Sequence, residues 1–358
     1  MKISGKAVVL TNGLFDTKSA KTAHGLIRAS KRFSIVAVID KKISGKFISL
    51  DANEKIILDE NSSGIPVYKD LNSFISSSIE ASYCIVGVAS AGGLLPDEMK
   101  SELLLALNHK MSIINGLHSM LNSDNELSSC AKKNSVIIHD IRKIKSRKEL
   151  SFWSGEIAFV KCPKVVVMGT DCGLGKRTTA KMVVDALVSK GYSAEMIYTG
   201  QTGWMQGWDY GFVFDSTLND FVSGELEKAV VGCYKEKNPD FILIEGQAAL
   251  RNPSGPCGGE FLVSCDVDGV ILQHSAERKY FDGWEHVEAI IPSVESEINL
   301  INAYGKNVLA IALSSSKMTA EELIAYKNLI SKSLDKPVFM PLEEGVDEIA
   351  DILITLKK

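Results

Sequence analysis

A glycine-rich segment between a predicted strand and a predicted helix carries the residues best suited to bind a phosphate group. The β-branched run 165–167 predicts a buried strand, and the apolar stripe over 180–187 predicts a helix that ends near Gly191. A helix N-terminus presents unpaired N–H groups and a partial positive charge, to which Lys176 adds a full charge. We expect a cofactor phosphate to be bound by this set: Gly169, Thr170, Asp171, Gly173, Gly175, Lys176, Arg177, Thr178 and Thr179.

This segment departs from the common P-loop pattern in two places. Five residues, instead of four, separate Gly169 from the Gly175-Lys176 pair. Arg177 stands where the pattern has Ser or Thr, whose hydroxyl normally binds Mg²⁺, and Thr178 comes one residue late. We therefore predict a phosphate site without a protein-bound metal.

Glu245 follows the apolar run 241–244, which predicts a buried strand. In an open α/β sheet the carboxyl ends of the strands form the ligand-binding edge. An acid at this place can coordinate Mg²⁺ or act as a base, and its structural alternative is a helix cap. Its position after an all-apolar strand favours a functional role.

Four other polar residues also follow predicted strands. Gln201 and Thr202 come after one strand, and His274 and Arg278 come after another. We expect Gln201, Thr202 and Arg278 to bind the substrate, and His274 is a candidate catalytic residue. Arg278 can reach a phosphate or a carboxylate. A single histidine more often has a structural role, which stays the alternative for His274.

The N-terminal part reads as a βαβ unit over 6–39, with Asp40 at the end of its second strand. Such an acid binds ribose hydroxyls in dinucleotide-binding folds, but the Gly-x-Gly-x-x-Gly signature is missing here. The pattern predicts a Rossmann-like domain that does not bind NAD in the standard way. Lys18 and Lys21 follow the first loop and either clamp a substrate carboxylate or only make the helix soluble.

Composition and element order predict a two-domain α/β protein. The 358 residues are 45% hydrophobic and 23% charged, which is ordinary for a globular chain. We expect a Rossmann-like domain over 1–150 and a doubly wound P-loop NTPase-like domain over 151–358. The parallel sheet of the second domain is predicted from seven apolar runs, 165–167, 194–198, 241–244, 267–273, 289–291, 308–312 and 338–340.

Several classes of protein are disfavoured by the same composition. The net charge of −4 and the lack of a long basic cluster argue against nucleic-acid binding. No apolar stretch is long enough to span a membrane, and residues 1–15 lack a signal-peptide pattern, so we expect a cytoplasmic protein without membrane contact. The seven cysteines show no Cys-x-x-Cys spacing, which argues against disulfides and structural zinc.

The string Gly-Thr-Asp-Cys-x-x-Gly-Lys-x-Thr-Thr-Ala at 169–180 resembles the P-loop of the D-glutamate N-acetyltransferase family. Further marks of this family are Asp220-Phe221 and the strings at 18–23, 38–40, 91–93, 200–203 and 245–247. The resemblance implies acetyl-CoA as donor, an acidic D-amino acid as the small-molecule acceptor, and a homo-oligomer. The acceptor amine must lose a proton, for which Asp220, Glu245 and His274 are the candidate bases.

Two other functions stay open at this point. The spelling Gly-Thr-Asp-x-x-x-Gly-Lys also resembles dethiobiotin synthetase, an ATP- and Mg²⁺-dependent ligase. A ligase or kinase of this kind would use Lys176 on the phosphates and Glu245 with Asp171 around Mg²⁺. A nucleotide-binding regulator without chemistry is the third possibility.

Overall fold

The computed structural model describes residues 3–51, 54–60, 63–89, 91–315 and 317–357. The chain forms two compact units, and each has its own sheet, which confirms the predicted α/β class. The first unit consists of Met1–Ile144 together with Gln201–Trp208, and the second of Lys145–Gly200 and Asp209–Lys358. Within the described part of the chain, no helix is both long and apolar enough to cross a membrane.

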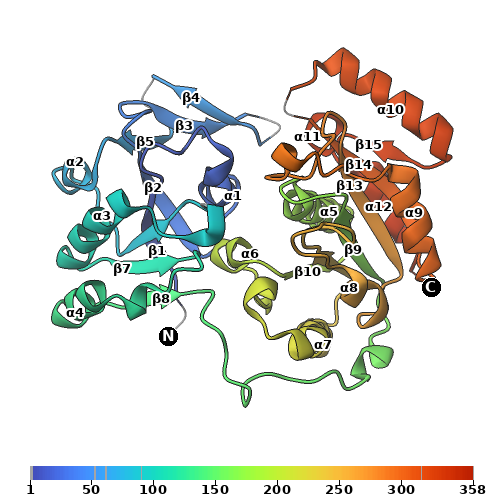
Figure 1. The fold of residues 1–358 in the computed structure, drawn as a ribbon, viewed down its shortest axis with the longest axis horizontal. Helices are drawn as coiled ribbons and strands as arrows, with labels where there is room; N and C mark the ends of the chain where they lie inside the picture. The colour runs from blue at the N-terminus through green and yellow to red at the C-terminus, as the bar shows by residue number, and fades with distance from the viewer. Residues whose placement is uncertain (1–2, 52–53, 61–62, 90, 316, 358) are drawn as a thin grey trace. The chain divides into compact units, whose positions relative to one another are not determined.

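The sheet of the first unit has the order β4-β3-β5-β2-β1-β6-β7-β8 (Figure 1). Its strands pair in parallel except where β3 pairs with β4 and β5. The strands are β1 Gly5–Leu10, β2 Phe33–Ile39, β3 Phe47–Leu50, β4 Ile56–Asp59, β5 Ile65–Tyr68, β6 Tyr83–Val86, β7 Ser112–Asn115 and β8 Ile138–Asp140. The α-helices are α1 Lys21–Arg28, α2 Leu71–Ile75, α3 Asp97–Asn108, α4 Asn125–Lys133 and α6 Gln201–Gln206.

Asp40, the acid at the end of β2, closes the loop that follows β1. Its side chain is fully buried, and Oδ2 accepts hydrogen bonds from the Thr11 hydroxyl at 2.7 Å and the Gly13 amide at 2.8 Å. The other oxygen, Oδ1, accepts from the Lys42 amide at 2.9 Å. The carboxylate that would bind a ribose in a dinucleotide-binding fold is therefore occupied by protein donors.

The sheet of the second unit is entirely parallel, in the order β11-β10-β12-β9-β13-β14-β15 (Figure 1). Its strands are β9 Lys164–Gly169, β10 Ala194–Tyr198, β11 Tyr210–Gly211, β12 Phe241–Glu245, β13 Gly269–Ser275, β14 Val308–Ser314 and β15 Val338–Phe339. Its α-helices are α5 Lys176–Ser189, α7 Asn219–Lys237, α8 Gly259–Val263, α9 Val294–Ala303, α10 Ala320–Leu334, α11 Pro341–Glu344 and α12 Asp347–Ile354.

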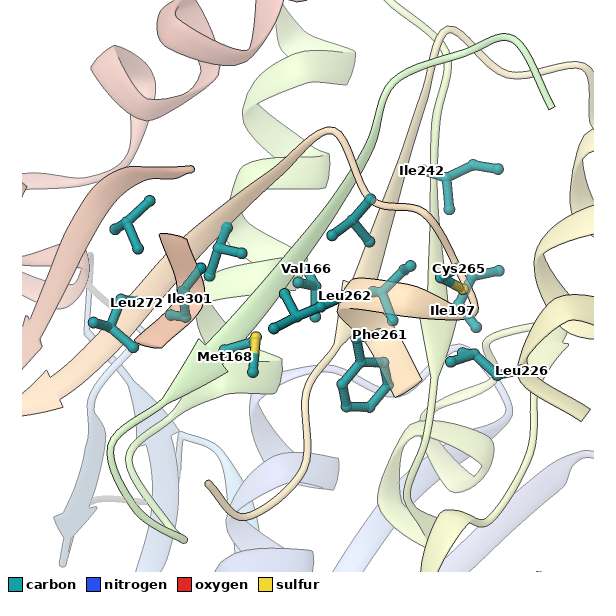
Figure 2. Packing of buried hydrophobic residues seen from close by; sticks show 14 of the residues in the cluster. Val166, Met168, Ile197, Leu226, Ile242, Phe261, Leu262, Cys265, Leu272 and Ile301 are labelled. Atoms are coloured by element: carbon teal, nitrogen blue, oxygen red, sulfur yellow. The ribbon is translucent and has the colours of Figure 1, made fainter. Parts of the chain in front are cut away.

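Alternate residues of the central strand β9 face different layers of this unit. Val166 and Met168 belong to a buried cluster that contains Leu226 of α7, Phe261 of α8 and Ile301 of α9 (Figure 2). The helix α5 packs on β9, β10 and β12 and against α12. Because side chains along a strand alternate between the two faces, the sheet is covered on both, and the apolar run of β9 is buried throughout.

The structure corrects one predicted strand and adds four short strands. The run 289–291 is not a strand of the sheet, because it lies in the loop after β13, where Ile290 forms a single bridge to Tyr280 and is 61% exposed. Short strands in both units, β3, β4, β5 and β11, were not expected from the sequence. An apolar triplet does not by itself distinguish a loop from a strand, and the triplet 165–167 is followed in addition by a glycine-rich turn and a helical apolar stripe.

Two buried acids of α7 fasten the segment that enters the second unit. Glu225 accepts from the Ser151 amide at 3.0 Å, and Glu227 accepts from the Ser154 amide at 2.5 Å and the Ile157 amide at 3.1 Å. A Cβ on Gly224 would lie 2.0 Å from the Ser151 carbonyl oxygen, so this contact requires glycine. Paired with backbone N–H groups, these buried carboxylates have structural roles.

Candidate phosphate-binding site

The glycine-rich segment forms an open loop between β9 and α5. Gly173 and Gly175 adopt φ values of 65° and 98°, in the left-handed region that glycine enters at little cost. Gly175 is the residue before the first turn of α5, and both glycines are exposed. The loop thus leaves the N–H groups at the start of a 14-residue helix accessible to an anion.

Lys176 lies across this loop with its ammonium group buried. Its Nζ donates to the carbonyl oxygen of Asp171 at 2.7 Å and to that of Ala248 at 2.9 Å. A Cβ on Gly169 would lie 3.1 Å from Cδ of Lys176, so the glycine makes room for the lysine chain. Burial lowers the pKa of Lys176, because the ammonium has lost water and its hydrogen-bond acceptors here are neutral carbonyls. An anionic ligand would compensate this charge.

Asp171 holds the loop through hydrogen bonds to both of its carboxylate oxygens. Oδ1 accepts from Asn252 Nδ2 at 3.1 Å, and Oδ2 accepts from Arg278 Nη1 and the Asp282 amide, each at 2.8 Å. The same Arg278 nitrogen also donates to the carbonyl oxygen of Cys172 at 2.6 Å. Asp171 and Arg278 therefore hold the loop in shape, and their predicted contacts to a cofactor or substrate stay predictions.

Strand β13 fixes two threonines of the predicted set. The hydroxyl of Thr170 lies 2.9 Å from Nδ1 of His274, and that of Thr179 donates to Gln273 Oε1 at 2.7 Å. The second ring nitrogen of His274 lies 3.2 Å from the hydroxyl of Tyr326. Because both ring nitrogens have partners and the residue is only 7% exposed, the contacts of His274 fit a positioning role better than that of a base.

Acid is expected to destabilise the protein through His274. Burial lowers the pKa of its imidazole from 6.5 to about 4. Between these two pH values the unfolded chain binds a proton that the folded chain does not, so stability falls as the pH drops through this window. The full difference corresponds to about 3 kcal/mol. Replacing His274 with Gln should make the melting temperature less dependent on pH between 6.5 and 4.

The melting temperature of wild type and variant, measured across that window, tests this expectation. His24 is a second buried histidine, in the first unit, where its ring contacts the Phe15 carbonyl. Burial also lowers its pKa, so His24 should contribute to the same pH dependence in wild type and variant. An identical pH dependence of wild type and His274→Gln would show that the imidazole of His274 titrates normally.

Glu245 ends β12 beside the glycine-rich loop of residues 169–176, the predicted phosphate loop. Its side chain is only 7% exposed, and Oε2 accepts a hydrogen bond from the Thr199 amide at 3.0 Å. The other oxygen, Oε1, lies 3.6 Å from Nη1 of Arg177, in the first turn of α5. Gln247 also contacts this strand end, because its Nε2 donates to the Thr199 hydroxyl at 2.8 Å. The strand end therefore brings a carboxylate next to the phosphate loop, where the sequence places it.

The remaining predicted residues are divided between the two units. Asp220 lies exposed in the first turn of α7, and Thr178 is half-buried in the first turn of α5. Lys18 and Lys21 are exposed in the first unit, before and at the start of α1. Gln201 and Thr202 are buried in the first unit, where the Thr202 hydroxyl lies 3.4 Å from that of Thr22. The assigned roles of all these residues stay predictions.

Three residues shape the loop through contacts that the sequence did not predict. Gln273 is the last residue of the strand predicted over 267–273, so its position gave a usable signal. Asn252 and Ala248 lie in the segment after Gln247, and they act on the loop through an amide and a carbonyl. A backbone acceptor such as that of Ala248 leaves no mark in the sequence, because every residue has one.

Comparison with known families agrees with both units. Residues 151–350 match a family described as "Domain of unknown function (DUF1611_C) P-loop domain". Residues 51–144 match its companion, "Domain of unknown function (DUF1611_N) Rossmann-like domain". The Rossmann-like and P-loop assignments predicted from the sequence are thereby confirmed.

Two curated relatives resemble about three quarters of the chain, and one solved structure resembles nearly all of it. A D-glutamate N-acetyltransferase of Pseudoalteromonas sp is 27% identical over 76% of this chain and 82% of its own length. A D-glutamate N-acetyltransferase of Tritonibacter scottomollicae is 26% identical over 75% of this chain and 80% of its own length. The crystal structure of a DUF1611 family protein from Anabaena variabilis covers 98% of this chain and 99% of its own, with a TM-score of 0.85 and 25% identity.

Proposed function

This chain belongs to the DUF1611 family, and we propose that it is an N-acetyltransferase which moves an acetyl group from acetyl-CoA to the amine of D-glutamate or a similar acidic D-amino acid. The observation that carries the proposal is the buried ammonium of Lys176, hydrogen-bonded to two carbonyl oxygens beside a helix N-terminus, in a chain whose curated relatives are named D-glutamate N-acetyltransferase. The fold alone would not identify the reaction.

The phosphate loop suits the diphosphate of CoA. The glycines at 173 and 175 leave the backbone N–H groups exposed, and Lys176 supplies a positive charge at the same place. Acetyl transfer does not hydrolyse this diphosphate, so the loop needs only to hold it. Charge-assisted hydrogen bonds to phosphate are the strong ones among such contacts.

The transfer itself requires a proton acceptor. The amine nitrogen attacks the thioester carbonyl, the C–N bond forms, the C–S bond breaks, and the CoA thiolate leaves and is protonated. Before attack the ammonium group must lose a proton to a base. Among Asp220, Glu245 and His274, we assign this role to Glu245, because it lies next to the phosphate loop and its Oε1 is 3.6 Å from Arg177, beyond hydrogen-bond distance, whereas both ring nitrogens of His274 have hydrogen-bond partners. It either takes the proton or orients the ammonium by its charge.

The ligase alternative is less well supported by the same geometry. It would need Glu245 and Asp171 as ligands of Mg²⁺. Both oxygens of Asp171 accept hydrogen bonds from protein donors, and Glu245 faces the guanidinium of Arg177. The regulator alternative differs from both in predicting no turnover.

Ligand-dependent stabilisation and turnover test the proposed function. A ligand bound only by the folded state raises the melting temperature, so acetyl-CoA and CoA should do so more than ATP with Mg²⁺ or NAD. Release of free CoA thiol should then depend on D-glutamate. Stabilisation by ATP with Mg²⁺ alone, with ADP formed on turnover, would overturn the proposal in favour of the ligase. A homo-oligomer and a cytoplasmic location stay predictions.

A further inference from the structure

An ion pair of the protein lies where P-loop enzymes hold Mg²⁺. In those enzymes the hydroxyl of the residue after the P-loop lysine and an acid at the end of a neighbouring strand bind the metal. In this chain the two positions are Arg177 and Glu245, whose Nη1 and Oε1 atoms lie 3.6 Å apart. The acid suited to bind a metal therefore already faces a fixed positive charge.

Two other groups that could help to form a metal site are also engaged. Asp171 is fully buried and is bound by Asn252, Arg278 and the amide of Asp282. The hydroxyl of Thr179 donates to Gln273. A divalent cation prefers several carboxylate, carbonyl or hydroxyl oxygens around it, so these residues do not fit Mg²⁺.

We infer that the guanidinium of Arg177 takes the place of Mg²⁺, and that this site binds a diphosphate as the metal-free anion. Glu245 holds the guanidinium at the end of β12, while Thr199 in turn holds Glu245 by its amide. A guanidinium stays charged at all working pH values and presents N–H donors in a planar fork that matches two phosphate oxygens. The side chain of Arg177 is 21% exposed, so one edge can meet a ligand.

This inference deepens the proposed function and rests on it for the identity of the donor. The diphosphate of CoA is esterified at both ends, so it lacks the terminal phosphate through which ATP chelates Mg²⁺. A site with a built-in cation would thus favour a diphosphate diester over a metal–nucleotide complex. The ligand class follows from Arg177 and Glu245, whichever acyl group the donor carries.

Calorimetric titration with inorganic pyrophosphate tests the inference without any turnover. Wild-type protein should bind pyrophosphate in EDTA, and added Mg²⁺ should weaken binding, because it would bring a second cation against Arg177. Arg177→Thr restores the usual hydroxyl. It should lose at least about tenfold in affinity in EDTA, the scale of one charge-assisted contact, and should gain affinity when Mg²⁺ is added.

Two control variants separate this effect from general changes in charge or folding. Lys190→Ala removes one positive charge from the far end of α5, where the lysine pairs with Asp351 at 2.8 Å, and should bind like wild type. Arg177→Lys keeps the charge without the planar fork and should still bind without metal, with intermediate affinity. Melting curves verify that each variant is folded.

Three results would overturn the inference. They are pyrophosphate binding by wild type only when Mg²⁺ is present, no binding under either condition, and unchanged affinity of Arg177→Thr in EDTA. Failure of the proposed function looks different, since acetyl transfer to D-glutamate would then be absent while metal-free pyrophosphate binding persists.

Discussion

Glu245→Gln is expected to yield a folded protein whose kcat is lower by at least about 10²-fold, the cost typical of losing a general base. Glutamine keeps the shape of the side chain and an oxygen acceptor for the Thr199 amide, which now binds Oε2 at 3.0 Å. It removes the negative charge and the basicity. Affinity for acetyl-CoA should stay within a few-fold, so the loss should appear in kcat.

Steady-state kinetics and melting curves of matched variants decide this prediction. Glu227→Gln changes another buried acid, which holds the backbone at Ser154 and Ile157, and should lower the melting temperature without lowering the turnover of folded protein. Near-normal turnover of Glu245→Gln would move the base to Asp220 or His274. Unfolding of the variant would show instead that Glu245 serves the structure.

Lys176→Met is expected to weaken cofactor binding by more than about tenfold, because a hydrogen bond to a charged group contributes about 1.5–3 kcal/mol. The melting temperature of this variant should rise or stay the same. The ammonium of Lys176 is buried against two neutral carbonyl oxygens, and burial of its charge costs free energy, which lowers its pKa. Methionine fills a similar volume without that cost.

Titration calorimetry with acetyl-CoA measures the affinity, and thermal melting measures the stability. Lys181→Ala is the matched control, since this lysine lies one turn further along α5 and pairs with Asp185 at 2.7 Å. Equal affinity of Lys176→Met and wild type would remove Lys176 from the binding site. A large drop in melting temperature would mean that its contacts to Asp171 and Ala248 mainly hold the loop.

Local sequence patterns were sufficient for the elements that carry the site. Three valines in succession and a helical apolar stripe predict β9 and α5, because each pattern is satisfied only by burying that element against neighbours. The acid after β12 could be placed for the same reason, since a buried strand has a defined carboxyl end. The run 289–291 is equally short but does not form a strand of the sheet, because Ile290 is 61% exposed and forms only a single bridge to Tyr280.

The sequence by itself determined that a lysine, glycines and a helix N-terminus meet in one loop, and that Glu245 ends a neighbouring strand. These relations are local, or follow from the parallel order of strands. Only the tertiary structure decided which partner each side chain takes. Asp171 binds Arg278, which is 107 residues further along the chain, and Arg177 faces Glu245. Such pairings depend on packing between distant segments, and the spacing of residues along a chain does not specify them.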